Sequence, residues 1–89
     1  MTHPMISEAV WRERGRYQGK VHAMRVQPMA GVATLECTLA DDTGRITVIF
    51  LGRREIPGIH LGVQLVVEGM VGSHKGRLAI IDPEYGFAT

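Results

Sequence analysis

The segment from Leu39 to Phe50 contains two apolar runs joined by an acidic turn that ends in glycine. Asp42, Thr43 and Gly44 suit a tight reversal, because an Asp side chain can hydrogen-bond to nearby backbone and Gly accepts the positive φ that closes such turns. Apolar and polar residues alternate on both sides of this turn, which predicts strands with one buried and one solvated face. The inward set is Leu35, Cys37, Leu39, Ile46, Val48 and Phe50, and the outward set is Thr34, Glu36, Thr38 and Thr47.

The rest of the chain supports further strands. Its 89 residues suffice for one domain with a modest core, and 11 glycines against 4 prolines favour a β protein with tight turns and bulges. A first strand is expected over residues 15–28, with a close approach of backbone at Gly19 and a change of phase near Ala23. Further strands are expected over residues 32–40, 63–72 and 77–81, with turns at 28–31 and 73–76 and a loop of at most one helical turn at 52–62.

The N-terminal segment, residues 1–13, contains the one candidate helix, at residues 6–12, where Ile6 and Val10 are four positions apart. Trp11 then has two interpretations: it packs this helix over an open end of the sheet, or it serves an interface. Tyr17 is expected in the core or at its rim. The predicted core consists of Val21, Leu35, Cys37, Leu39, Ile46, Val48, Phe50, Leu65, Val67, Leu78 and Ile80.

The sequence does not favour catalysis or metal binding. Cys37 is the only cysteine, which excludes an intramolecular disulfide, and its inward position makes it a small buried hydrophobe. Ser7 and Ser73 lack a nucleophile motif, and adjacent Asp41 and Asp42 would point apart. No paired metal-ligand spacing occurs, and no enzyme, cofactor or metal site is expected. The scattered histidines are His3, His22, His60 and His74.

The sequence has no signal-peptide pattern and no apolar run long enough to span a membrane, so a soluble cytoplasmic protein is expected. Its net charge is +1, but residues 1–27 hold five of the ten Lys and Arg residues and two of the nine acidic ones. Positive charge is therefore biased toward the first strand.

Five strands with a crossing between the third and the fourth match the order of an all-β, five-stranded Greek-key barrel of the oligonucleotide/oligosaccharide-binding (OB) class, over residues 14–89. The runs at 19–21, 39–48 and 65–72 resemble the anticodon-binding type of OB fold, found in class II aminoacyl-tRNA synthetases and helicase wedge domains. A closer resemblance is to small stand-alone OB-fold proteins of actinobacteria, through the runs at 50–54, 56–59 and 82–85. Together the similarity extends from about Arg14 to Phe87.

The resemblance implies nucleic-acid binding on the outer face of the second and third strands, framed by the loops between strands one and two and between strands four and five. In the synthetase relatives an aromatic residue often stands three positions before the Leu-x-Asp of the second strand, and here that position is Glu36. A carboxylate cannot stack on a base and repels phosphate. The candidate contacts are Arg45, Thr47, Ile49, Leu51, Arg53, Arg54, Lys75 and Arg77.

Two function classes follow from the sequence. The first is a module that binds single-stranded DNA or RNA with weak sequence preference. The second is a protein-interaction adaptor or homodimer that covers an exposed Ile49 and Leu51. The candidate contacts also have interpretations that involve no ligand. Lys75 and Arg77 could keep the hairpin soluble. Arg53 and Arg54 could pair with carboxylates instead of phosphates, and the candidate carboxylates are Glu55, Asp82 and Glu84.

Overall fold

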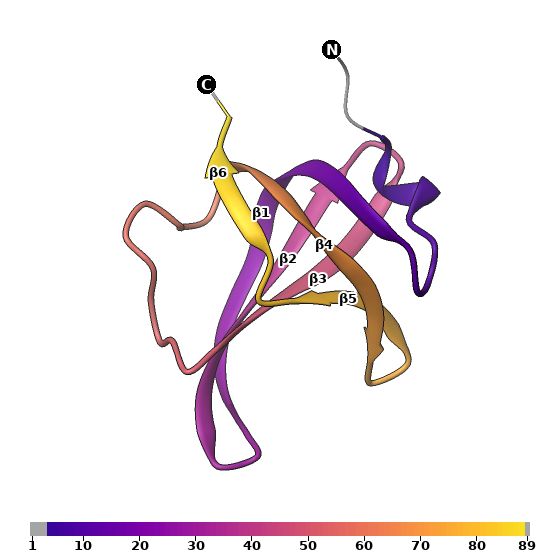
Figure 1. Cartoon of the computed structure of the whole chain (residues 1–89). Helices are drawn as coiled ribbons and strands as arrows, with labels where there is room; N and C mark the ends of the chain where they lie inside the picture. The colour runs from indigo at the N-terminus through magenta and orange to yellow at the C-terminus, as the bar shows by residue number, and fades with distance from the viewer. Residues whose placement is uncertain (1–3, 89) are drawn as a thin grey trace.

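A computed structural model describes residues 4–88 of the chain. Met1 to His3, in the predicted N-terminal segment, and Thr89, at the end of the predicted barrel, lie outside the described residues. Figure 1 shows strands that wrap around a common interior. The elements are the 3-10 turn η1 (Ile6–Glu8) and the strands β1 (Arg14–Met29), β2 (Val32–Asp41), β3 (Gly44–Leu51), β4 (Gln64–His74), β5 (Arg77–Ile81) and β6 (Glu84–Phe87).

The strands β1 to β5 form a closed, barrel-like sheet. β1, β2 and β3 pair antiparallel in sequence order, and β3 then lies parallel to β5. β5 pairs antiparallel with β4, and β4 pairs antiparallel with the first half of β1, which closes the ring. β6 also pairs antiparallel with β4. It was not predicted, because it has only four residues and all of them are exposed. The prediction of an all-β protein is confirmed.

The long first strand changes register where the sequence indicated. Val21 pairs with Leu39 and Ala23 pairs with Thr38, so His22 is an extra residue in a β-bulge. Gly19 permits the expected close approach, since a Cβ atom there would lie 3.1 Å from the carbonyl oxygen of Ala40. The bounds of β1, β2 and β4 differ from the predicted bounds by one or two residues, and β5 begins and ends as expected.

The predicted helix over residues 6–12 is wrong. The helical conformation ends after Glu8, because Ala9 is extended and Arg12 has a φ of 71°. The Arg12 amide then donates to the Val71 carbonyl, so that the chain joins the sheet instead of continuing a helix. Ile6 is buried in the core, whereas Trp11 is 53% exposed and does not belong to the core cluster.

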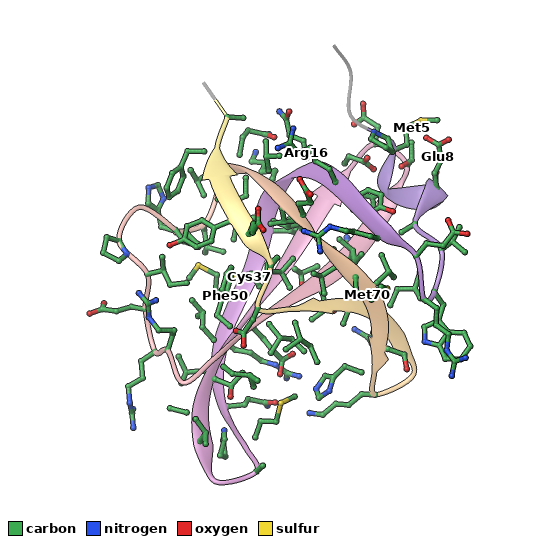
Figure 2. The ribbon with its side chains drawn as sticks, in the orientation of Figure 1. Met5, Glu8, Arg16, Cys37, Phe50 and Met70 are labelled. Carbon is green, nitrogen blue, oxygen red and sulfur yellow. The ribbon has the colours of Figure 1, made fainter. Side chains whose placement is uncertain are left out.

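The core agrees closely with the predicted one. All its expected members are buried except Leu78, which is partly buried against the cluster. Figure 2 shows Cys37 in the middle of the molecule, and burial raises the pKa of its thiol to about 11, which keeps the thiol protonated at neutral pH. The sequence missed Ile56 and Ile59 as core residues, since they belong to the loop between β3 and β4, which forms no helix or strand, as expected.

The hairpin turns are tighter than predicted, and one is closed differently. Ala30 and Gly31, with φ of 51° and 79°, form a two-residue turn between β1 and β2. Lys75 and Gly76, with φ of 53° and 77°, do the same between β4 and β5. Gly44 does not have the positive φ that was expected of it. The β2–β3 turn is closed instead by the Asp41 carboxylate, which accepts hydrogen bonds from the Thr43 amide, the Thr43 hydroxyl and the Gly44 amide.

Candidate nucleic-acid interface

A hollow of about 390 Å³ lies on the outer face of β2 and β3. It is bounded by β1 on one side and by the β4–β5 hairpin on the other, and both the β1–β2 and β4–β5 hairpins project from the lower part of the molecule in Figure 1. We call it the β2–β3 groove. Its lining residues are Ala23, Met24, Arg25, Glu36, Thr38, Thr47, His74, Lys75 and Arg77.

The groove continues past Arg77 into a second hollow of about 210 Å³. The two hollows share Ala23, Thr38, Thr47 and Arg77. The second one adds His22, Arg45, Ile46 and Leu78. The polar residues of β2 and β3 that line the groove alternate with residues that face the core. This alternation places their side chains on the outer face. Because of the bulge at His22, Ala23 and Arg25 of β1 also lie on this face. Ala23 is the cross-strand partner of Thr38, and Arg25 is the cross-strand partner of Glu36.

Positive charge is concentrated along this groove. The residues that line the two hollows include four of the ten Lys and Arg side chains and one of the nine acidic ones. The four cations are Arg25, Arg45, Lys75 and Arg77. Because the remainder of the chain has more acidic than basic residues, the groove is electropositive on a nearly neutral molecule.

Glu36 is the single carboxylate of the groove, and its side chain is only 12% exposed. The Arg25 guanidinium lies 3.6 Å from one of its oxygens, and the His74 Nε2 atom lies 4.0 Å from the other. Both distances are longer than the roughly 2.7–3.2 Å between donor and acceptor in a hydrogen bond. Within residues 4–88 the Glu36 carboxylate accepts no hydrogen bond from the protein, so its lone pairs are left for another donor.

One end of the groove is closed by a contact between the two hairpins. The Lys75 ammonium donates a hydrogen bond of 3.2 Å to the side-chain oxygen of Gln27. This contact links the β4–β5 hairpin to β1 over the face of β2 and β3.

Thr34 was expected in solvent but is buried on this face, where its hydroxyl donates to the Val32 carbonyl.

Ile49 was predicted to be an exposed contact residue, and this prediction is wrong. Its side chain is 0% exposed. Ile49 lies between Glu36 of β2 and Ile81 of β5 in the sheet, and no part of its side chain is open to solvent. The chain therefore covers Ile49 itself. This burial removes half of the apolar pair that motivated an adaptor or homodimer, and leaves Leu51, which is 40% exposed.

The remaining predicted contacts divide into two groups. Arg45, Thr47, Lys75 and Arg77 lie together in the groove and its continuation. Arg53 and Arg54 are exposed in the loop after β3 and line neither hollow.

Two of the three carboxylates suggested as partners for the loop arginines have other contacts. Asp82 accepts a hydrogen bond of 2.9 Å from the Leu51 amide, and Glu84 lies 3.6 Å from Arg14. Among the ion pairs of residues 4–88, none involves Arg53 or Arg54.

Sequence reasoning did not place Arg25 and His74 in the site. Arg25 alternates with the inward-facing Met24, which is a usable signal once the bulge is located. The position of His74 depends on the exact turn between β4 and β5, which the sequence placed two residues too early.

The described residues include no group of three or more His, Cys, Asp or Glu side chains that could hold a metal ion. Over residues 4–88 there is also no helix with the length and apolarity needed to cross a membrane. Comparison with known proteins gives no match, either to a protein-family model or to a curated protein.

Proposed function

We propose that this chain is an OB-fold module that binds single-stranded DNA or RNA in the β2–β3 groove. The observation that carries the proposal is the charge distribution: four Lys and Arg side chains and one carboxylate line a groove on a chain with nine acidic residues. Proteins that bind single strands without strong sequence preference use such a cationic groove to follow the phosphate backbone.

The strand order supports the OB assignment. An antiparallel β1–β2–β3 meander, a parallel β3–β5 contact and closure through β1 and β4 agree with a five-stranded Greek-key barrel of this class. In OB folds the face of strands two and three, together with the loops that flank it, binds oligonucleotides. The β2–β3 groove occupies that place. The resemblance of the sequence motifs to anticodon-binding OB domains points to the same class of ligand.

The lining of the groove limits the expected affinity. Its residues include no Phe, Tyr or Trp on which a base could stack, and a stacked base contributes roughly 1–3 kcal/mol in other single-strand binders. Phosphate contacts from about three or four cations remain. We therefore expect dissociation constants on the order of micromolar or weaker at moderate salt, with a steep dependence on ionic strength.

The test is fluorescence anisotropy with labelled single-stranded DNA and RNA over a series of salt concentrations. The test variant combines Lys75→Asn with Arg77→Gln, where Asn suits the positive φ of position 75. The matched control combines Arg53→Gln with Arg54→Gln, which removes the same charge from outside the groove.

The groove variant should bind more weakly. It should also lower the log–log salt slope by roughly 1.4, at about 0.7 for each phosphate that is no longer neutralised. The control should change the slope by less than half as much. The proposal fails if the folded wild-type protein shows no salt-sensitive binding at low ionic strength. It also fails if the two double variants reduce binding equally.

A further inference from the structure

Glu36 does not fit a groove that contacts phosphate alone. Its carboxylate is negative and lies among four cations, where it would repel a phosphate backbone. It is also largely withdrawn from water and accepts no hydrogen bond from residues 4–88. A carboxylate kept in this position is suited to a ligand group that donates hydrogen bonds, since it can only accept them.

In a single strand, such donors belong chiefly to the bases, whose Watson–Crick edges are available for recognition. Guanine has two adjacent donors on this edge, N1–H and N2–H, which match the two oxygens of a carboxylate. Adenine and cytosine have one amino donor beside a ring-nitrogen acceptor. Uracil and thymine have one N–H between two carbonyl oxygens, which a carboxylate repels. A carboxylate therefore distinguishes guanine from the other bases.

The neighbours of Glu36 complete the match. Beside its two donors guanine carries an acceptor, O6, which calls for a positively charged or hydrogen-bonding donor next to the carboxylate. Arg25 lies 3.6 Å from one Glu36 oxygen, and His74 lies 4.0 Å from the other. Both side chains carry N–H groups. The groove thus presents two acceptor atoms with a donor at either side.

On the basis of the proposed function, we infer that Glu36 is a specificity-determining residue that selects guanine in a bound single strand. Its two oxygens accept hydrogen bonds from guanine N1–H and N2–H, and Arg25 or His74 donates to O6. The other cations of the groove, Arg45, Lys75 and Arg77, contact the phosphates. The module therefore binds single strands weakly in general and binds guanine-containing segments more tightly.

The test compares labelled uridine-rich RNA strands of equal length that contain isolated guanines, inosines or adenines. Inosine retains N1–H and O6 but lacks the N2 amino group, so it removes one proposed hydrogen bond only. For the wild-type protein, anisotropy should give binding of the guanine strand about tenfold tighter than of the inosine strand, within the range of a good bidentate contact. The adenine strand should bind no more tightly than the inosine strand.

Two variants separate base recognition from a structural role of Glu36. Glu36→Gln should bring the ratio of guanine to inosine affinity close to one, because an amide has a single acceptor oxygen and cannot accept hydrogen bonds from both N1–H and N2–H. The matched control is Glu68→Gln on β4, which removes a carboxylate that is also ion-paired, 3.3 Å from Arg14 and 3.2 Å from Arg16, but lies outside the groove. It should leave the ratio unchanged.

Each outcome has a distinct meaning. Salt-sensitive binding with equal affinity for guanine and inosine strands overturns the role of Glu36 and leaves the proposed function in place. A Glu36→Gln variant that weakens binding to all strands equally shows a structural role only. If that variant does not fold, the inosine comparison on the wild-type protein decides alone. No binding to any strand overturns both proposals.

Discussion

Asp41 connects segments that are distant in the sequence. One of its carboxylate oxygens accepts from the Ile6 amide at 2.8 Å. The other accepts from the Thr43 amide, the Thr43 hydroxyl and the Gly44 amide, at 2.7, 2.6 and 3.0 Å. Burial raises the pKa of this carboxyl, but the hydrogen bonds from Ile6, Thr43 and Gly44 outweigh it and lower the pKa below its ordinary value.

Replacing Asp41 by Ala should reduce the free energy of unfolding by about 1–3 kcal/mol at pH 7, the scale of hydrogen bonds to a charged group. Because the folded-state pKa lies below the unfolded one, the charged carboxylate stabilises the fold at pH values above the unfolded pKa, about 3.9. This stabilisation is lost as the pH falls through the folded-state pKa. The difference between wild type and variant should therefore be larger at pH 7 than at pH values below the unfolded pKa, as measured by urea denaturation.

The neighbouring carboxylate provides the control for this measurement. Asp42 lies in the same turn, and the hydrogen bonds of residues 4–88 that close the turn involve Asp41 instead. Asp42→Ala should change the unfolding free energy by less than about 0.5 kcal/mol. Equal losses from both substitutions would show that the Asp41 hydrogen bonds do not stabilise the protein. The sequence predicted the position of this turn but not its closure by Asp41. The link to Ile6 depends on the tertiary fold and has no local signal.

The β1–β2 hairpin contains a residue that is poorly suited to its turn. Ala30 has a φ of 51°, in the left-handed region where a Cβ atom is unfavourable. Gly31 follows with a φ of 79°. Asn-Gly is the preferred pair for a two-residue turn of this type, so the sequence at positions 30 and 31 is not optimal for the hairpin it forms.

Ala30→Asn should raise the free energy of unfolding by about 0.5–1 kcal/mol, because Asn tolerates the left-handed conformation better than Ala. Ala30→Val should lower it, since β-branched residues are least suited to a positive φ. Both values can be measured by thermal or urea denaturation. A stabilising Val or a destabilising Asn would show that position 30 does not adopt this conformation in solution.

Alternation was sufficient to predict β1 to β5 and most of the core, because one face of each strand is buried. It could not predict β6, which has four exposed residues and gains its place by pairing with β4. The helix predicted at residues 6–12 depended on the spacing of Ile6 and Val10 and on Ser7 or Pro4 near its start. A backbone hydrogen bond from Arg12 to Val71 in β4 outweighed that weak local preference.

On the scale of the whole molecule, the outer face of β2 and β3 has a covered part and an open part. Ile49 and Thr34 are buried on this face, whereas Glu36, Thr38 and Thr47 line the open β2–β3 groove. The sequence identified this face and four of its residues, Arg45, Thr47, Lys75 and Arg77. It could not show which part is covered, because that depends on the tertiary packing of segments that are distant in the sequence.

Ile49→Lys should destabilise the monomer by about 3–5 kcal/mol, since it places a charge where the native side chain is fully buried. The control is Leu51→Lys, two residues along the same face of β3, where 40% of the side chain is exposed; it should cost less than about 1 kcal/mol. Urea denaturation measures both. Sedimentation that showed a wild-type dimer, dissociated by a folded Ile49→Lys protein, would contradict the burial of Ile49 within one chain.

The closure of the sheet also sets the order in which the chain can fold. The β1–β2 and β2–β3 pairings join neighbouring segments, whereas closure pairs Arg14–Lys20 with Gln64–Met70 from near the other end of the chain. Bringing such distant segments together costs loop entropy before any contact compensates for it. The hairpins can therefore form early, but the β1–β4 ladder must wait until the loop after β3 has placed β4. We therefore expect topology to limit the folding rate, on the millisecond-to-second scale typical of β proteins with distant pairings.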